Sequence, residues 1–448
     1  MCIKRHIHGI MYCKITRYTI LAAAALLLTA LSTACKDKEF FDKENYENIV
    51  GDGFPVTEVD AEHLWTTVTS ALTDIHLDEE YEGNSFVEVY LKHPSSDNTA
   101  LQAASGTVAP GGHLRTPFSF PITQSTFYVA VTDAAGRRVV KTCGLNNGTV
   151  SQTFRGAESK ANGTYVGDAQ PVPPRFGIRY CFESDFPLIG DYDFNDVVLT
   201  LRPYVEGRTV RLDVTLDAVG MMTQVAAAIR VQGVRRGDVV AVSREGDFDT
   251  NNGRPMSSFN IIDTKEILLP DNLNHTSDIV IYLFNDAHWA LLKKSETNGN
   301  VGRAYCNTQH TGADGFSPSV ETTPVTVTYR FELASETAAN RFVAEYLDAF
   351  IIENSNASYC EVHTTVYKNA EVIYSYFNDP EAYDNPYTWA LQMPSTFRYP
   401  IEGTVVGSNR KEVYTGAYQT PGHSFPEWAR NRNEATDWFD YPDPWHVY

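Results

Sequence analysis

The sequence predicts a mostly β protein, with a small N-terminal β-sandwich followed by a larger β-sandwich domain that has long loops and few short helices. Two observations predict this class. Short runs of alternating apolar and polar residues, rich in Val, Ile, Thr, Tyr and Phe, recur along the chain, and Gly- and Pro-rich turn segments separate them. Aromatic residues make up 12% of the 448 residues, which is ample material for buried cores, and this length exceeds one ordinary core.

The first sandwich is expected over residues 55–157. Its predicted strands include "SFVEVYLKH" (85–93) and "STFYVAVTD" (125–133), and a further pair, "RRVVKTCGL" and "GTVSQTF", turns around residues 146–148. The segment that follows, "ESKANGTYVGDAQPVPP" (158–174), has the composition of a linker.

The larger domain is expected over residues 175–448. It starts at "RFGIRYCFESDF", and its predicted strands include "DVVLTLRPYVEG", "TVRLDVTLDAVG", "VAAAIRVQGV", "DIVIYLFND" and "TVTYRFELA". Polar insertions at 244–256 and 294–323 are expected as surface loops. A meander or Greek-key sandwich is the natural solution for so many short strands.

Residues 1–34 are expected to be a signal peptide rather than part of the fold. Lys14 and Arg17 precede the short apolar run "ILAAAALLLTAL", which ends in small residues. Translation starting at Met1 or at Met11 would leave this pattern intact. The small residues just before Cys35 resemble a bacterial lipobox, which predicts acyl chains on Cys35. The alternative is an ordinary cleaved signal with an incidental cysteine.

Residues 35–54 are expected to be the lipidated cysteine and a polar tether between lipid and fold. The charged stretch "CKDKEF" resembles the export signal of Bacteroidetes surface lipoproteins. This resemblance implies a lipid-anchored protein of the outer membrane, exposed at the cell surface, with the membrane as one partner.

The charge of the chain excludes one class of partner. The formal net charge is −20, and removal of residues 1–34 leaves 32 Lys and Arg against 56 Asp and Glu, a net charge of −24. A surface this acidic repels phosphate backbones and attracts cations, so no nucleic acid is expected as a partner.

Four cysteines remain after Cys35: Cys143, Cys181, Cys306 and Cys360. None lies in a C-x-x-C pair, which argues against a zinc ribbon. An exported compartment permits disulfides, and four cysteines allow three pairings. Unpaired buried thiols are the other alternative.

The stretch "GDYDFNDVV" (190–198) concentrates oxygen donors just before an apolar run. Asp191, Asp193 and Asn195 would share one face of an extended segment, Asp196 can turn inward, and Glu183 lies upstream. Hard divalent cations such as Ca²⁺ take six to eight oxygen ligands. The stretch is not an EF-hand, because no Gly follows Asn195 and no Glu stands at the twelfth position. We therefore predict a structural Ca²⁺ site here.

The alternative is a turn whose Asp and Asn side chains bond to the local backbone. A second candidate, "GDFDTNNG" (246–253), offers Asp247, Asp249 and Asn251, but its composition favours a solvated loop.

Several segments together resemble the LruC-domain family of bacterial surface lipoproteins. The first is "YCFESDFPLIGDYDFNDVVLTLR", in which Ser184 stands where the family usually has Asp. The C-terminal segments are "LDAFIIEN" with "EVHTT", and "PYTWALQMPSTFRYPIEG" followed by "AYQTPGHSFPEWARNRNEATDWF". The resemblance covers roughly residues 160–448. It implies surface exposure and an acidic motif, and it leaves the activity open.

The sequence is compatible with three functions. The first is a non-enzymatic surface lipoprotein with a structural Ca²⁺ ion, acting in adhesion or surface interaction with proteins or glycans. The alternative is a carbohydrate-binding accessory lipoprotein of a glycan-uptake system, with tail aromatics that stack on sugars. A hydrolase is disfavoured because no G-x-S-x-G or H-E-x-x-H is present. The tail contains Trp389, Trp428, Trp438 and Trp445. The alternative to sugar stacking is that these side chains pack in a core, and this alternative is favoured for Trp389 and Trp428.

Overall fold

The structure, a computed structural model, describes most of the chain after residue 58. The predicted signal peptide, Cys35 and tether lie outside the described residues. The described residues are 59–94, 101–167, 174–184, 186, 190–248, 261–262, 266–292, 304–308, 319–355, 358–364, 372, 387–407 and 417–448.

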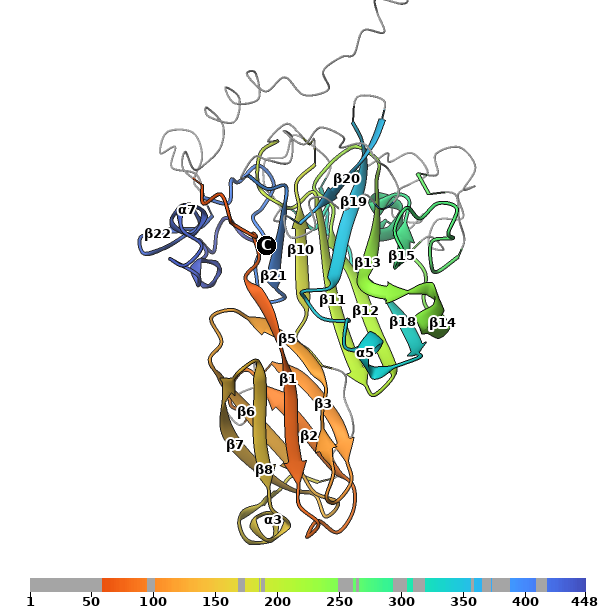
Figure 1. The fold of residues 1–448 in the computed structure, drawn as a ribbon. Coiled ribbons are helices and arrows are strands. Elements are labelled where there is room, and N and C mark those ends of the chain that lie inside the picture. Colours follow the sequence, from red (N-terminus) through yellow and green to blue (C-terminus); the bar gives the residue numbers. More distant parts are fainter. Residues whose placement is uncertain are drawn as a thin grey trace, which may run out of the picture. The chain divides into compact units, whose positions relative to one another are not determined.

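The predicted class is confirmed, since the fold is mostly β. The first nine strands form one sheet in the order β3-β2-β6-β7-β8-β1-β4, with β5 paired to β1 and β9 to β7 (Figure 1). These strands are β1 (Val68–Leu77), β2 (Ser85–Tyr90), β3 (Gln102–Val108), β4 (His113–Leu114), β5 (Pro117–Pro121), β6 (Thr126–Thr132), β7 (Arg137–Asn146), β8 (Thr149–Phe154) and β9 (Thr164–Tyr165).

The core of this sheet is built from apolar residues of its strands. Val87 and Val89 of β2 and Val129 of β6 are fully buried. The rings of Phe118 and Phe120 from β5 meet that of Phe127 edge to face, at centroid distances of 5.6 and 5.0 Å. This packing folds the long sheet over itself as a sandwich.

The segment expected as a linker contains regular structure at its start. Helix α3 (Gly156–Asn162) is followed by β9, whose residues pair with the first two residues of β7. The Gly156 N–H donates to Asp78 at 2.9 Å, and the Ser159 hydroxyl donates to Asp133 at 2.7 Å. These polar contacts attach to the first sheet a segment whose composition alone predicts a linker.

The remaining long strands form two further sheets. A six-stranded antiparallel sheet has the order β14-β18-β12-β11-β10-β21, and a four-stranded one has the order β15-β13-β19-β20. Their strands are β10 (Ile178–Phe182), β11 (Val197–Glu206), β12 (Thr209–Ala218), β13 (Val225–Arg235), β14 (Val239–Glu245), β15 (Asp278–Phe284), β18 (Val325–Leu333), β19 (Leu347–Ser355), β20 (Ser358–His363) and β21 (Ala390–Pro394).

These two sheets pack face to face as a second sandwich (Figure 1). Tyr329 of β18 donates its hydroxyl to the carbonyl of Tyr282 in β15 at 3.4 Å, and Tyr180 of β10 donates to the carbonyl of Leu347. Odd-numbered residues of β18 therefore face the core, whereas Arg330 faces outward. This alternation decides which side chains later form an outer surface.

Short elements complete the described fold. Strands β16 and β17 pair with each other, as do β22 and β23. The short strands are β16 (Tyr305–Cys306), β17 (Ser319–Val320), β22 (Gln419–Thr420) and β23 (His423–Ser424). The helices besides α3 are η1 (Arg236–Asp238), α4 (Ala287–Leu291), α5 (Glu336–Ala339), α7 (Phe425–Arg430) and η3 (Trp438–Asp440).

The C-terminal aromatics form a core rather than a stacking surface. The ring centroids of Trp428 and Trp438 lie 5.4 Å apart, and that of Trp65 lies 5.6 Å from that of Trp428. The side chains of Trp428 and Trp438 are 1% and 0% exposed. Trp389 is 5% exposed, whereas Trp445 is 81% exposed. Three of the four tail tryptophans are thus unavailable to a sugar, and only Trp445 is open to solvent.

The four cysteines do not form the disulfides considered from the sequence. Cys143, Cys181, Cys306 and Cys360 are all buried, and none of them forms a disulfide in the described structure. Burial raises the pKa of Cys143 above its ordinary value, which keeps this thiol neutral and unreactive. The alternative of unpaired buried thiols therefore describes these residues.

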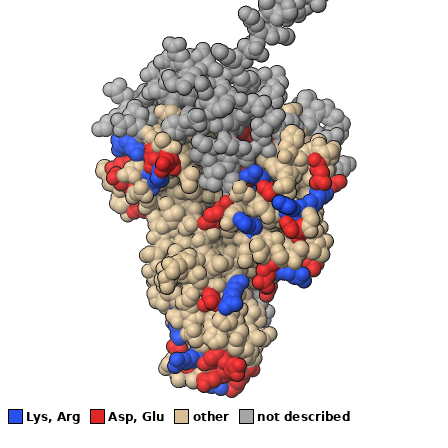
Figure 2. Space-filling view, viewed as in Figure 1, with Lys and Arg blue, Asp and Glu red and all other residues tan. Residues whose placement is uncertain are grey.

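The described part of the chain contains no helix long and apolar enough to cross a membrane. On the face shown in Figure 2, Asp and Glu gather most densely at one end of the first sheet. Exposed acids of the β1–β2 turn, Glu79, Glu80 and Glu82, lie there, and Lys160 of α3 pairs with Glu82 at 2.6 Å.

Candidate metal centre

The acidic stretch joins two neighbouring strands of the six-stranded sheet. β10 ends at Phe182, and β11 begins at Val197 as its antiparallel partner. The chain between them must therefore reverse beside the end of the sheet. Glu183 follows β10 directly and Asp196 precedes β11, so strand pairing alone brings these two acids to one place.

The residues 190–196 do not form the extended segment expected from alternation. Gly190, Tyr192 and Phe194 have positive φ angles of 64°, 58° and 55°. Bulky residues rarely adopt this left-handed conformation, and each costs about 1–2 kcal/mol. Both rings are buried and meet at 4.5 Å, which holds the backbone in this shape. The prediction of an extended segment is therefore wrong here. Left-handed residues, and not the pleating of a strand, turn the side chains of Asp191 and Asp193 to one side.

Three carboxylates converge in this loop. Glu183, Asp191 and Asp193 each offer one oxygen, and these oxygens all lie within 4.8 Å of one another. Glu183 and Asp193 are buried, whereas Asp191 stands exposed at the rim. Asp196 is 6% exposed. The structure thus places the predicted acids together at the edge of a core.

Backbone amides hold these carboxylates in place. Glu183 Oε2 accepts the N–H of Phe194 at 3.1 Å, and Asp196 Oδ2 accepts that of Ser184 at 2.6 Å. Asp193 accepts two, from Asn195 at 3.0 Å and from Gly403 at 2.8 Å. The turn interpretation is correct to this extent, but these bonds do not separate the like charges.

Asn195 carries an acceptor that the protein leaves unused. Its side chain is fully buried, and its Nδ2 donates to the carbonyl of Pro400 at 3.2 Å. Its Oδ1 is buried without a hydrogen-bond partner among the described residues. Gly220 makes room for this amide, since a Cβ there would lie 1.7 Å from Oδ1. An orphaned buried carbonyl is costly unless a ligand satisfies it.

Glu402 is a member of the cluster that sequence reasoning missed. It lies beyond β21, next to the Gly403 amide that binds Asp193, and its N–H donates to Thr308 at 2.8 Å. Its Oε2 is also buried without a hydrogen-bond partner among the described residues. Burial, followed by the charges of Asp191 and Asp196, raises the pKa of Glu402 to about 9.

The same causes act on the buried acids of the loop. Burial raises the pKa of Glu183 well above its ordinary value, and neighbouring carboxylates, Asp196 first, raise it further. Burial and the charge of Asp191 do the same to Asp193. In the described part of the chain, no Lys or Arg pairs with Glu183, Asp193 or Glu402. The cluster is therefore a concentration of negative charge without a side-chain counterion for these three acids.

This arrangement fits a hard cation. The described donors are carboxylate and amide oxygens, the ligands that Ca²⁺ and Mg²⁺ take, and the cluster holds no Cys or His of the kind that zinc prefers. The orphaned oxygens of Asn195 and Glu402 supply acceptors that the fold does not satisfy. The buried acidic cluster could thus hold a metal ion.

The raised pKa values predict an unusual pH dependence without metal. Glu402 stays protonated up to about pH 9 when folded, whereas an unfolded glutamate ionises near its ordinary value of 4.5. The native state binds more protons in that window, so the free energy of unfolding falls as pH rises. In EGTA we expect the melting temperature to decrease between pH 5 and pH 9. Thermal unfolding at several pH values checks this.

Saturating divalent cation should remove most of that decrease, because the ion favours the ionised carboxylates. His363 contributes a slope of the same sign: burial alone would lower its pKa, but the charges and hydrogen bonds of Asp348 and Glu361 together raise the pKa of His363 to about 9. That slope is common to both conditions, so the difference between them reports the acidic cluster. Parallel pH curves with and without cation would contradict this assignment.

The second acidic candidate does not assemble a comparable site. Asp247 pairs with Arg244 at 2.9 Å, which already neutralises its carboxylate. Asp249 and Asn251 lie outside the described residues. The expectation of a solvated loop there stays a prediction.

Comparison with known proteins finds a matching family and a similar solved structure. The family described as a domain of unknown function, DUF4842, matches residues 208–439. The search of curated proteins found no match. Among solved structures, the chain is similar to one from Bacteroides ovatus described as a lipoprotein. The two share 15% identity and a TM-score of 0.46, over 81% of this chain and 98% of the other.

Proposed function

The chain belongs to the DUF4842 family, and from this premise we propose that it is a non-enzymatic, lipid-anchored surface protein stabilised by Ca²⁺. It acts in adhesion or in other contacts at the cell surface. The LruC resemblance stays a prediction, and its acidic motif precedes the matched residues 208–439.

One observation carries the calcium proposal. The fold concentrates buried carboxylates around orphaned oxygens of Asn195 and Glu402, at the ends of strands that come from distant parts of the chain. An ion would bridge the loop after β10, the start of β11 and the turn after β21. Its binding free energy would add directly to the stability of the second sandwich.

Calcium is preferred over magnesium for reasons of coordination. Ca²⁺ accepts six to eight oxygens in flexible geometry, whereas Mg²⁺ demands a near-ideal octahedron and usually keeps several waters. Glu183, Asp193 and Asn195 are buried side chains with little room for retained water. An all-protein cage of carboxylate and amide oxygens therefore favours the larger ion.

The anchor and the location follow from the sequence. Cys35 after a short apolar run supports lipidation, and the acidic "CKDKEF" stretch supports export to the outer surface. The lack of G-x-S-x-G and H-E-x-x-H in the sequence supports a non-enzymatic role. The carbohydrate-binding alternative has its own supporting feature, a surface pocket on the six-stranded sheet that holds Arg211 and Arg330.

Thermal unfolding tests the proposal. The chain from residue 35 onward, with Cys35→Ser, is compared in 2 mM Ca²⁺ and in EGTA, and Mg²⁺ serves as the control cation. We expect Ca²⁺ to stabilise it by about 3–4 kcal/mol if this concentration is 100–1,000 times the Kd. An unchanged melting temperature would reject the calcium site.

The anchor is tested in cells that produce the full chain. We expect the unchanged protein in the membrane fraction and its Cys35→Ser variant in the soluble fraction. Equal membrane recovery of both would reject the lipid anchor and leave the calcium result untouched.

A further inference from the structure

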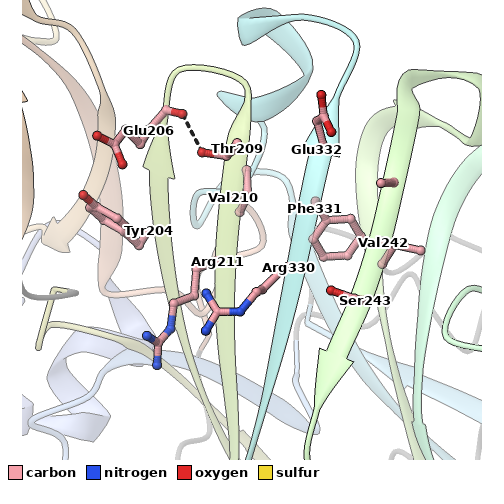
Figure 3. A pocket seen from close by; sticks show the side chains of 11 residues that line it. Tyr204, Glu206, Thr209, Val210, Arg211, Val242, Ser243, Arg330, Phe331 and Glu332 are labelled. Atoms are coloured by element: carbon pink, nitrogen blue, oxygen red, sulfur yellow. Dashed lines mark hydrogen bonds between the residues drawn. The ribbon is translucent and has the colours of Figure 1, made fainter.

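A second polar cluster lies on the outer face of the six-stranded sheet. Figure 3 shows it as a cup formed by β11, β12, β18 and β14, and its volume is about 500 Å³. The side chains of Tyr204, Arg211, Arg330 and Ser243 lie on this face, because they alternate with core residues such as Val210 and Phe331. A volume of this size is typical of small-ligand sites, which span roughly 300–1,000 Å³.

Strand register places two arginines directly opposite each other. Arg211 of β12 pairs with Arg330 of β18, and the same row continues to Tyr204 of β11 and Ser243 of β14. Figure 3 shows the two guanidinium groups side by side on neighbouring strands. Like charges in directly opposite positions destabilise a sheet. An anion bound between them would relieve that repulsion.

Each arginine is held by a single carboxylate at one nitrogen. Arg211 donates through Nε to Asp213 at 2.9 Å, and Arg330 donates through one terminal nitrogen to Glu245 at 3.2 Å. Asp213 also accepts the hydroxyl of Thr328 at 2.6 Å. A guanidinium has five N–H donors, and the others of this pair bond to no described residue. The arginines are thus positioned but have donors to spare.

The rim of the cup is rich in oxygen. Glu206 and Glu332 are exposed, and with Thr209 they occupy the next row of the sheet. Thr209 donates its hydroxyl to the main-chain carbonyl of Glu206 at 2.8 Å, as Figure 3 shows. The carboxylate of Glu206 lies beside the hydroxyl of Tyr204, and the oxygens of Glu206 and Glu332 on the exposed side can accept ligand hydroxyl groups. Because four acids surround the two arginines, a ligand's negative charge is favoured only directly between the guanidinium groups, and further negative charges on the ligand would be repelled.

We propose that this cup binds a saccharide that carries a carboxylate, of the uronic acid class. Its carboxylate would lie between Arg211 and Arg330, its hydroxyls would donate to Glu206 and Glu332, and the Tyr204 ring would flank the sugar. This site is separate from the acidic loop, and it gives the carbohydrate-binding alternative a specific ligand class.

Calorimetric titration of the chain from residue 36 onward tests the proposal, with Ca²⁺ present throughout. The probes are a disaccharide of one galacturonic acid unit and one galactose unit, which carries a single carboxylate, and the neutral galactose disaccharide of the same linkage. We expect the acidic sugar to bind about tenfold or more tightly than the neutral one, because charged hydrogen bonds are the stronger ones. Arg330→Gln should weaken acidic-sugar binding by a similar factor. Arg115→Gln, on the first sheet, is the matched control and should leave the affinity unchanged.

Hydrogen exchange gives a second readout that does not depend on any variant. The acidic disaccharide should protect amides of β12 and β18 around residues 209–212 and 328–332. Protection elsewhere, equal binding of both sugars, no binding of either, or full affinity in Arg330→Gln would each overturn the proposal. None of these outcomes depends on whether the acidic loop binds metal.

Discussion

The Asp193→Asn variant is expected to lose most of the stabilisation that Ca²⁺ gives the wild-type protein. Asp193 is fully buried, and its neighbours are the carboxylates of Asp191 and Glu402. The substitution removes one negative charge from the cluster and keeps the side-chain volume. We expect a loss of about 2–3 kcal/mol in Ca²⁺, which corresponds to a fall of roughly 5 °C in melting temperature. Unfolding in 2 mM Ca²⁺ measures it.

In EGTA the same substitution should change stability by about 1 kcal/mol or less. Burial and the neighbouring carboxylates already raise the pKa of Asp193 and disfavour its charge without metal, so the loss of that charge costs little, and the main cost is one backbone hydrogen bond. Asp247→Asn is the matched control, because Asp247 belongs to the other acidic motif and already pairs with Arg244. Equal losses in both conditions would mark Asp193 as a turn residue, and the calcium proposal would fail.

Local sequence could identify the acids of this centre but not its geometry. The spacing of Asp191, Asp193 and Asn195 indicated a set of oxygen donors on one side of the chain. The structure brings Asp191 and Asp193 together by a different route, through left-handed residues at Tyr192 and Phe194. Bulky residues seldom adopt that conformation, and burial of their rings against distant segments stabilises it. No local pattern reports such tertiary support.

Glu402 shows what sequence alone could not supply. It lies more than two hundred positions from Glu183, and no spacing rule connects them. The link is the antiparallel pairing of β10 with β21, which places the turn after β21 beside the loop after β10. β21 is a five-residue, fully buried strand with no polar alternation, so the period-2 pattern was absent there.

Strands with clear alternation or β-branched runs were predicted well. The segments containing β2, β6, β11, β12, β13, β15 and β18 were all identified from the sequence. The segment of α3 and β9 was predicted wrongly as a linker, because its residues are small and polar. Their order comes from contacts with the β1–β2 turn and with β7, which composition does not encode.

The Gly220→Ala variant is expected to destabilise the protein whether or not calcium is present. A Cβ at this position would lie 1.7 Å from Asn195 Oδ1 and 2.9 Å from the Asn195 carbonyl oxygen, so the buried amide must move. Overpacking of this kind costs about 2–3 kcal/mol, which predicts a fall of roughly 5 °C in EGTA. Because the displaced oxygen is a proposed ligand, the stabilisation by Ca²⁺ should shrink as well. Thermal unfolding in both conditions measures the two effects.

Gly144→Ala is the matched control for this effect, since a Cβ there meets nothing within 4 Å. Its melting temperature should stay within about 1–2 °C of wild type in both conditions, as expected for a surface substitution. The comparison separates two roles of Gly220, which gives space to the amide and, through that amide, shapes the metal centre. A Gly220→Ala protein that lost stability but kept the full Ca²⁺ response would show that Asn195 Oδ1 is no ligand. Packing alone would then compensate the cost of this buried oxygen without a hydrogen bond, and only the carboxylates would bind the ion.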